Sequence, residues 1–464
     1  MMNKETLSQT WRLAWPISLQ SVLTSSLSMI DIAMISHLGD SAVGAVGLGN
    51  RFLFVVTVIV LGIAWTVGVL AAQFYGAGKP ERIRSTILRA CILANVALVL
   101  FTAWIFMSAE SIIGWGTNSA EVIHLGAQYL WVVTPSLTCL AVVLILENAI
   151  RGLGEVRAPM VLSIFAISSN IALNYWLING GLGVPALGVL GAAIATTIAR
   201  VLHVFMLIAM LYLRNHPLRI HKHDWHGLLS IEAIKKFLAL AVPMMISFGV
   251  WSSGTFVYQL IFGRMGTREL AVMSTVSPIE GVVLSLFFGL ASACSITIGQ
   301  HLGANRFDQA WRYAKSFAVF NPAAGFVVGL LILALRDVIL QPFSDLPAET
   351  LEVTYQVYTV LCLALWLKII NMTLAMGILR AGGENKVCMH IDIVGMWLVS
   401  IPLTALAAFY FQWPLVWVVL VAFSEDICKG ILFTHRVLKK YWLKNLSEQH
   451  DELENVPGSD QNRI

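Results

Sequence analysis

Asp31 is an acidic residue in the largely apolar run of residues 27–34, and no Lys or Arg lies within one helical turn of it. If this run crosses a bilayer, the charge costs about 2.5–3.5 kcal/mol even on the most lenient scale. A carboxyl group buried without a cationic partner favours its protonated form, which is the property that a proton carrier needs. The alternative is that Asp31 ends a helix at the outer interface and faces water.

Asn170 and Asn174 are four residues apart, so they share one face of a helix. Each amide can donate a hydrogen bond to a carboxylate or offer its oxygen to a cation or a protonated acid. Asparagines also commonly join helices within membrane bundles, and the spacing alone does not separate the two roles. Thr196 and Thr197 either complete such a polar pocket or belong to the small-residue packing of residues 191–197.

Other ionisable residues in apolar stretches form a second, weaker set of candidates. Glu147 lies one turn before Arg151, so an interfacial ion pair at a helix end is expected. Asp426 and Lys429 are three residues apart and can neutralise each other in the same way. The other candidates are Glu280 after Pro278, Lys368, Asp392 and Glu425.

The composition is that of a membrane protein. Of 464 residues, 58% are hydrophobic and only 12% are charged, with a mean hydropathy of +0.77, whereas a soluble domain has about 25% charged residues. The apolar stretches are long enough to cross a bilayer as helices, and they lack the short alternating pattern of a β-barrel. We predict an all-α bundle of twelve membrane-spanning helices, near 10–35, 48–73, 86–107, 124–148, 158–179, 187–213, 234–262, 272–298, 313–335, 351–378, 386–410 and 413–435.

The basic residues predict the orientation of the chain. Most of the 30 Lys and Arg residues lie at the termini and in every second loop, for example Arg82 and Arg84 after the second stretch. This bias places both termini in the cytoplasm. The net charge of +4 therefore reflects topology and not a nucleic-acid surface.

The sequence repeats itself once. One constant shift places Pro16 on Pro243, Asp31 on Tyr258 and the stretch 73–77 on 300–304. Further along the chain the shift grows by two residues, and the stretch 151–155 meets 380–384. A membrane protein made of two related halves typically carries a substrate between them by alternating access. We predict an N-terminal lobe at 1–213, a cytoplasmic connector at 214–233, a C-terminal lobe at 234–437, and a tail at 438–464 whose end is disordered.

Two features that suggest other chemistry have simpler interpretations. The loops 76–79 and 303–306 share a Gly-x-x-(Lys/Arg) pattern, which we interpret as a helix-capping glycine followed by cytoplasmic positive charge. The connector histidines lack a scaffold for zinc, so we expect a solvated loop and no metal site. These histidines are His216, His221, His223 and His226. The six cysteines are expected to pack inside helices.

The motifs resemble those of the multidrug and toxic compound extrusion (MATE) transporters. The likeness covers residues 8–437, in order and at the right spacing. No single motif carries it, but jointly the motifs are specific. They are Leu13-Ala14-Trp15-Pro16-Ile17 with Asp31 and the turn 36–39, then 72–78, 151–154, 170–174 and 379–383.

The resemblance implies a V-shaped bundle of two six-helix lobes around a central cleft. It also implies export of amphipathic, often cationic compounds in exchange for protons or sodium ions, with no cofactor and no enzymatic activity. Asp31 matches the cation-coupling residue, and Asn170 and Asn174 match its partners. Thr196 is our further candidate for this site, on the residue pattern alone. Some family members have an aspartate where Asn174 stands. Pro16 matches a proline linked to bending of the first helix.

Two positions favour protons as the coupling ion. Family members that bind sodium in the C-terminal lobe use acidic residues where Trp251 and Ile369 stand here. Sodium coupling through the N-terminal lobe remains an alternative, and a lipid-linked saccharide flippase is a further one. We expect a monomer in the cell inner membrane that transports small amphipathic drugs or organic cations and binds no nucleic acid.

Overall fold

The computed structural model describes residues 4–181, 183–225, 228, 230–343 and 346–451. Within these ranges the chain is helical, and an isolated bridge between Gly181 and Val184 is the only β-type pairing. The predicted disordered end of the tail, 452–464, and His226 lie outside the described residues.

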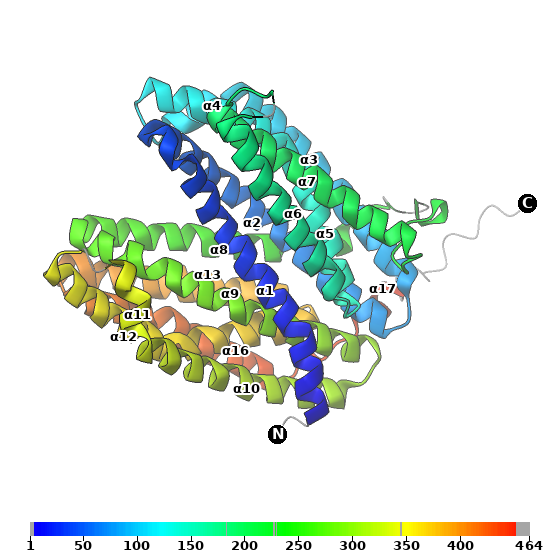
Figure 1. Cartoon of the computed structure of the whole chain (residues 1–464). Coiled ribbons are helices and arrows are strands. Elements are labelled where there is room, and N and C mark those ends of the chain that lie inside the picture. Colours follow the sequence, from blue (N-terminus) through cyan, green and yellow to red (C-terminus); the bar gives the residue numbers. More distant parts are fainter. Residues whose placement is uncertain (1–3, 182, 226–227, 229, 344–345, 452–464) are drawn as a thin grey trace, which may run out of the picture.

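The first half forms a bundle that we call the N-lobe, drawn in blue to green in Figure 1. A short 3₁₀ turn at Thr134–Ser136 joins α4 and α5 into one span. The helices are α1 Lys4–Ile35, α2 Asp40–Gly76, α3 Pro80–Gly114, α4 Ala120–Val133, α5 Leu137–Gly152, α6 Arg157–Asn179 and α7 Gly188–Leu213.

The second half forms the C-lobe, whose helices are more interrupted. π-helical segments at Thr373–Leu379 (η5), Val394–Ser400 (η7) and Leu406–Tyr410 (η8) continue the helices before them. The α-helices are α8 Ile231–Met265, α9 Thr267–Gly303, α10 Phe307–Ala334, α11 Arg336–Leu340, α12 Ala348–Met372, α13 Asn385–Ile393, α14 Ile401–Ala405, α15 Leu415–Ala422 and α16 Ser424–Leu438.

The predicted span at 413–435 differs from the others. Eleven helical stretches in the described residues are long and apolar enough to cross a membrane. The twelfth is divided at Phe423 into α15 and α16, and α16 carries Glu425, Asp426 and Lys429 within its first two turns. Neither α15, with 8 residues, nor α16, with 15 residues and these charges, is a long apolar helix by itself. Together the two short helices complete the twelve-helix bundle.

Local signals in the sequence explain where several helices begin. The hydroxyl of Ser119 accepts a hydrogen bond from the backbone N–H of Val122 at the start of α4. Ser230 accepts one from Ala233 in the same way at the start of α8. Such side-chain oxygens satisfy backbone donors that have no partner in the first helical turn.

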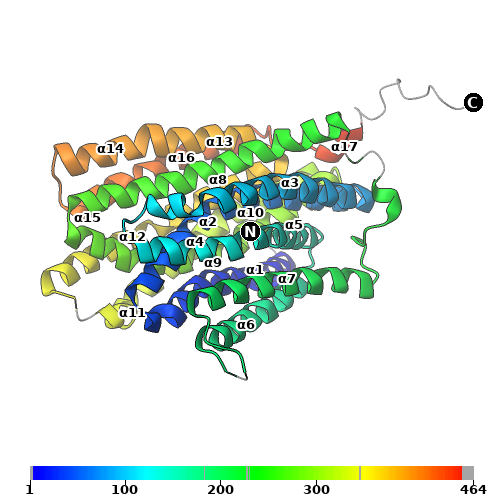
Figure 2. The ribbon, with the colours of Figure 1, turned by 90° about the horizontal axis from the view of Figure 1, so that it is seen from above.

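The two lobes pack side by side and diverge toward one end, which Figure 1 shows on its left (Figures 1 and 2). Helix α1 of the N-lobe packs along α9 of the C-lobe, and α2 packs along α8. The hydroxyl of Ser18 on α1 donates to the carbonyl oxygen of Leu286 on α9 over 2.5 Å. The lobes thus meet through equivalent helices of the two sequence repeats.

At the other end, two equivalent glutamines join the lobes. Gln73 of α2 donates to the carbonyl oxygen of Ala381 over 2.6 Å, and Gln300 of α9 donates to that of Gly152 over 2.9 Å. A Cβ atom added at Gly76 would overlap the carbonyl of Gln300, and one at Gly303 would overlap that of Gln73. We predicted these glycines as helix caps. Their role in the structure is the close crossing of α2 and α9, and Gly78 takes the positive φ of +72°.

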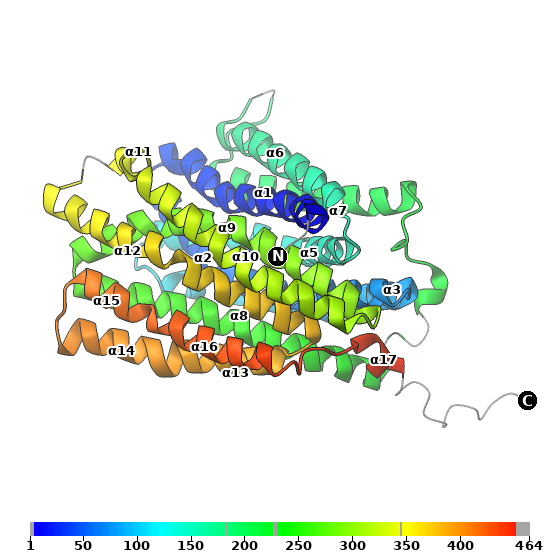
Figure 3. The ribbon, with the colours of Figure 1, turned by 90° about the horizontal axis from the view of Figure 1, so that it is seen from below.

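The chain that follows α16 contacts the crossing of α2 and α9 and leads into the short helix α17 (Leu446–Asp451), at the lower right of Figure 3. The backbone N–H of Leu446 donates to Oε1 of Gln73 over 2.7 Å, and Asn445 donates to the carbonyl of Gly303 over 3.2 Å. Trp442 is fully buried. Residues 442–447 therefore contact both lobes at the end where the lobes converge.

Candidate functional site

The structure brings Asp31 of α1 against α6. Nδ2 of Asn174 donates to Oδ1 of Asp31 over 2.7 Å and to Oδ1 of Asn170 over 3.1 Å. Both asparagines are buried, with 3% and 1% of their surfaces exposed, and Asp31 is partly buried. The predicted grouping of these three residues is therefore present in the fold, and their role in coupling stays a prediction.

Helix α7 supplies a cation that the local sequence of Asp31 does not contain. Arg200 lies close enough to Asp31 for their charges to interact, and its Nη1 donates to Oγ of Ser136 over 2.8 Å. The expectation that Asp31 has no cationic partner was therefore wrong. Tertiary packing provides the partner from a helix more than 160 residues away along the chain.

Thr196 lies on α7 one turn before Arg200. Its hydroxyl donates to the carbonyl oxygen of Ala192 in the same helix over 3.0 Å, and Thr197 donates to Val132 over 3.0 Å. No hydrogen bond joins Thr196 to Asp31 within the described part of the chain. Participation of Thr196 in cation coupling therefore stays a prediction without direct support from a contact.

Pro16 is buried inside α1, about four turns before Asp31. A proline within a helix removes one backbone hydrogen bond and favours bending at that point. The equivalent Pro243 lies inside α8. The position of Pro16 is thus suited to a hinge in α1, although its conformational role is a prediction.

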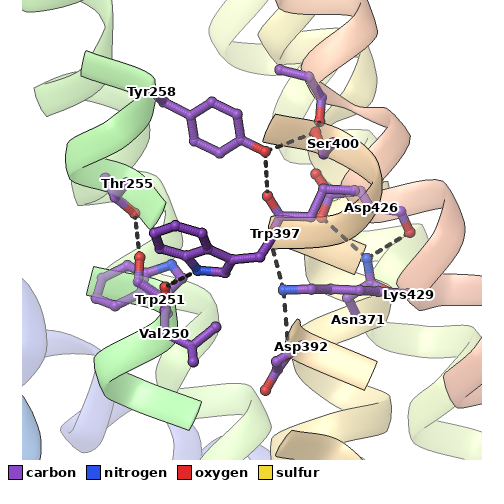
Figure 4. Close-up of polar contacts among 12 residues, drawn as sticks. Val250, Trp251, Thr255, Tyr258, Asn371, Asp392, Trp397, Ser400, Asp426 and Lys429 are labelled. Atoms are coloured by element: carbon purple, nitrogen blue, oxygen red, sulfur yellow. Dashed lines mark hydrogen bonds and ion pairs between the residues drawn. The ribbon is translucent and has the colours of Figure 1, made fainter. Parts of the chain in front are cut away.

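A second buried polar group lies in the C-lobe. The hydroxyl of Tyr258 on α8 lies 2.7 Å from Oγ of Ser400 and 2.9 Å from Oε2 of Glu425, within hydrogen-bond distance of both. Nζ of Lys429 lies 2.7 Å from Oε1 of Glu425 and 3.2 Å from Oδ1 of Asp392. Figure 4 shows Tyr258 pointing toward Ser400, and the ammonium of Lys429 next to Asp392.

Further ion pairs extend this C-lobe network. Arg380 lies 3.0 Å from Oδ2 of Asp392, and Lys368 lies 2.6 Å from Oε1 of Glu280. Nδ2 of Asn371 donates to Oδ1 of Asp426 over 3.1 Å. We define the C-lobe network as Tyr258, Glu280, Lys368, Asn371, Arg380, Asp392, Ser400, Glu425, Asp426 and Lys429.

The ion pairs differ in detail from those expected. Lys429 contacts Glu425 and Asp392, whereas its nearest expected partner was Asp426. One turn of helix allows either pairing, but Asp426 faces Asn371 on α12. The π-helical segment η5 begins two residues after Asn371, and η7 ends at Ser400. The irregular backbone therefore lies beside the network, as is common near functional sites.

A third polar group in the N-lobe was only partly foreseen. Glu147 and Arg151 form the expected ion pair at 3.3 Å, but both are buried, with 3% and 9% of their surfaces exposed, instead of lying at an interface. Gln20 and Ser163 donate to the same carboxylate, and His203 lies beside it. Gln20 lies eleven residues before Asp31, a spacing that puts both side chains on one face of α1. This spacing is the sequence signal that could have identified Gln20 as a further polar residue facing the N-lobe interior.

The remaining candidates take ordinary positions. His216 is buried and its Nε2 lies 3.2 Å from Glu155, while the carboxylate of Asp224 accepts from the backbone N–H of His221. No cluster of three or more His, Cys, Asp or Glu residues suited to a metal occurs in the described ranges. At the two C-lobe positions where some family members have acidic residues, this chain has Trp251, which is 47% exposed, and Ile369, which is fully buried. Neither side chain is acidic.

Known proteins share both the sequence pattern and the fold. The MatE family model matches residues 16–176 and 243–406. A probable multidrug resistance protein NorM of Thermotoga maritima is 24% identical over 403 residues, covering 86% of this chain and 85% of that protein. The probable multidrug resistance protein YoeA of Bacillus subtilis is 27% identical over 402 residues and covers 85% of each chain.

Solved structures agree at the level of the fold. The outward-facing conformation of a multidrug resistance MATE family transporter of the MOP superfamily superposes with a TM-score of 0.85 at 18% identity, covering 94% of this chain and 96% of that one. A variant of the Vibrio cholerae MATE transporter VcmN gives 0.85 at 17% identity, covering 94% and 98%. With the two-lobe bundle and the matching halves, the chain belongs to the MATE family, whose members are membrane transporters and not enzymes.

Proposed function

We propose that this chain is a multidrug efflux antiporter that exports amphipathic, often cationic compounds in exchange for protons. The observation that carries the proposal is the hydrogen bond from Asn174 to Asp31 within the N-lobe. It holds a titratable carboxylate inside a membrane bundle with one amide and a nearby guanidinium, Arg200, and Asp31 forms no close ion pair within the described residues. Such a carboxylate can gain and lose a proton during a transport cycle.

The chemistry of the group suggests how a proton changes the N-lobe. Ionised Asp31 accepts from Asn174 and balances the charge of Arg200. A protonated Asp31 is a donor, and Oδ1 of Asn174 is a buried oxygen with no hydrogen-bond partner in the described structure. Protonation therefore favours a reorientation of the Asn174 amide and a shift of α1, which can bend at Pro16 and alter the surface that α1 presents between the lobes.

The same unpartnered oxygen supports sodium as the second candidate ion. Oxygen atoms of Asp31, Asn170 and Asn174 lie together, and hard cations prefer such ligands. Trp251 and Ile369 offer no carboxylate at the two C-lobe positions, so a sodium ion would bind in the N-lobe. Proton coupling is the primary proposal because a single carboxylate suffices for it.

The proposed cycle needs a defined orientation and two moving units. We infer that residues 1–213 and 234–437 rock against each other, joined by the cytoplasmic connector 214–233, with both termini, including the tail 438–464, in the cytoplasm. The excess of Lys and Arg in the even-numbered loops supports this orientation in the cell inner membrane. A monomer suffices for this cycle because the substrate lies between two lobes of one chain.

Reconstituted protein tests the proposal. Efflux of a fluorescent organic cation is measured in proteoliposomes under a proton gradient and, separately, under a sodium gradient. We expect the proton gradient to drive transport in the wild type and not in Asp31→Asn. The matched control is Asp308→Asn at the exposed start of α10. Transport driven only by sodium would replace the proton with the second candidate, and normal transport by Asp31→Asn would remove Asp31 as the coupling residue.

A further inference from the structure

Polar side chains line the facing surfaces of α1, α6 and α7 through the N-lobe. On α6, Ser163, Asn170 and Asn174 share one face, because their spacings are close to whole helical turns. Thr196, Arg200 and His203 share a face of α7 in the same way. Helix α6 packs against both α1 and α7, so these faces lie close together. We call the group the N-lobe column: Gln20, Asp31, Glu147, Arg151, Ser163, Asn170, Asn174, Thr196, Arg200 and His203.

The end of the column farthest from Asp31, which we call the inner end, is centred on Glu147 of α5. Nε2 of Gln20 lies 2.9 Å and 3.0 Å from its two carboxylate oxygens, and Oγ of Ser163 donates to Oε1 over 2.6 Å. Nη2 of Arg151 lies 3.3 Å from Oε2 and donates to Oε1 of Gln20 over 2.6 Å. The ionised carboxylate is thus well satisfied, and Gln20 connects it to α1, the helix that carries Asp31.

His203 of α7 is the member of this inner group whose hydrogen bonding is incomplete. Its Nε2 lies 3.4 Å from Oε1 of Glu147 and is buried without a hydrogen-bond partner in the described structure. A proton on this nitrogen would turn the contact with Glu147 into an ion pair. Without that proton, Glu147 remains paired with Arg151. Both states of the imidazole are therefore compatible with the same surroundings.

The charges of the column balance when no extra proton is present. Asp31 and Glu147 are matched by Arg200 and Arg151, with His203 neutral. One added proton changes the column by one unit, whether it resides on Asp31 or on His203. The two positions are about 16 Å apart along the bundle, because Asp31 lies eleven positions after Gln20 along α1 and Gln20 contacts the Glu147 carboxylate beside His203. Moving a proton between them therefore changes its position and leaves the net charge of the column unaltered.

A small cavity lies between the lobes beside Arg151. A cavity of about 20 Å³ is lined by Asn148 and Arg151 of the N-lobe and by Ser292 and Ser295 of the C-lobe. This volume is large enough for a water molecule, and these four side chains offer the polar partners that such a molecule needs. A water molecule in this cavity would lie beside Arg151, the ion-pair partner of Glu147.

We propose that His203, positioned by Glu147, is the inner proton-exchange residue of the N-lobe. The inference rests on the proposed function, in which Asp31 receives the proton. The O–H bond of Asp31 breaks and water relays the proton to Nε2 of His203, where an N–H bond forms beside the Glu147 carboxylate. That N–H bond then breaks as water on the cytoplasmic side takes the proton. As His203 becomes charged, it competes with Gln20 for Oε1 of Glu147, which loosens the hold on α1.

The titratable groups that face the column come from several neighbouring helices. These are Glu147 and Arg151 of α5, Tyr129 of α4, Asp31 of α1 and Arg200 of α7 itself, while Gln20 of α1 and Ser163 of α6 contribute no titratable group. Glu147 is the nearest of them to the imidazole, with its Oε1 3.4 Å from Nε2 of His203.

The test separates the proton half of the cycle from the drug half. His203→Gln keeps a polar side chain and cannot titrate near neutral pH. In an antiporter, exchange of labelled for unlabelled drug at equal pH needs no proton release. We expect His203→Gln to keep drug exchange within about twofold of wild type, to lower proton-driven efflux about tenfold or more, and to flatten its dependence on cytoplasmic-side pH. The matched control is His124→Gln, at an exposed histidine of α4.

A second variant guards against a purely structural effect. In His203→Ala, imidazole added on the cytoplasmic side should restore part of the proton-driven rate, a result that a packing role cannot give. Normal proton-driven efflux in His203→Gln, with the wild-type pH profile, would overturn the inference while Asp31→Asn still tests the proposed function separately. Equal loss of drug exchange and efflux in folded His203→Gln, with no rescue by imidazole, would overturn it as well.

Discussion

The N-lobe column and the C-lobe network hold their buried charges in different ways. In the N-lobe, Asp31 is held by one amide hydrogen bond and by the charge of Arg200. In the C-lobe, Glu280, Asp392 and Glu425 each lie within 3.2 Å of a lysine or arginine nitrogen. A carboxylate in a close ion pair keeps its charge, whereas a lightly held one can change it.

The sequence repeat makes this comparison direct. Asp31 of the N-lobe corresponds to Tyr258 of the C-lobe, whose hydroxyl lies within hydrogen-bond distance of Ser400 and Glu425. Two copies of one half have thus come to place a titratable acid and a neutral phenol at equivalent positions. From this difference we propose that proton exchange belongs to the N-lobe and that the polar groups of the C-lobe stabilise the fold.

The largest effect is expected from Asp31→Asn. Removing the titratable group should lower proton-driven efflux by about a hundredfold or more, because the transported proton loses its carrier. The folded protein should persist, since an asparagine can still accept from Asn174. Efflux from proteoliposomes measures the change, with Tyr258→Phe as the equivalent variant of the other lobe. An equal loss in Tyr258→Phe would break the comparison, because both lobes would then take part.

Lys429→Met tests whether the C-lobe network stabilises the fold. The substitution leaves Asp392 and Glu425 without their shared cation, and breaking a buried pair in this way costs about 3–5 kcal/mol. We expect a large fall in thermal unfolding temperature in detergent. The double variant Glu425→Gln with Lys429→Met should recover part of the stability. An unchanged unfolding temperature in the single variant would show that the network contributes little.

Glu384 provides a reference pair outside the membrane spans. Burial would raise its pKa, but hydrogen bonds and charges from Lys444 and Arg436 outweigh that effect and lower the pKa below the ordinary 4.5. Its contribution to stability is therefore present above pH 4.5 and is lost as the pH falls through the lowered value. Glu384→Gln should lower the free energy of unfolding by about 1.5–3 kcal/mol at pH 7.

The pH dependence supplies the check on Glu384. Chemical unfolding at a series of pH values should show that the difference between wild type and Glu384→Gln shrinks below pH 4.5. Lys315→Gln, which removes an exposed cation beside Trp311, serves as the surface control. A difference that stays constant over this range would mean that packing, and not charge pairing, accounts for the contribution of Glu384.

The smallest effect is expected from Asp426→Asn. The C-lobe network has four carboxylates, Glu280, Asp392, Glu425 and Asp426, against three cations, Lys368, Arg380 and Lys429, so Asp426 is the residue whose charge is least directly matched. If the C-lobe is structural, proton-driven efflux by Asp426→Asn should stay within about twofold of wild type. A loss comparable with that of Asp31→Asn would place a second proton site in the C-lobe.

The sequence alone allowed much of the fold to be predicted. The apolar stretches gave the helical bundle, and the repeat gave two related halves, because span length and periodicity are local properties of the chain. The shared helical face of Asn170 and Asn174 follows from their spacing, and the same rule predicted the Glu147–Arg151 pair. The break at Phe423 was missed, since an apolar residue there carries no helix-ending signal.

Tertiary structure decided which faces meet. Arg200 approaches Asp31, and His203 approaches Glu147, only because α7 packs against α1, α5 and α6. The spacing of residues along one helix fixes which of its side chains lie on the same face. It leaves open the identity of the neighbouring helix, its rotation and its depth. Those depend on the packing of the whole bundle, so pairing of charges between distant helices becomes visible only in the folded chain.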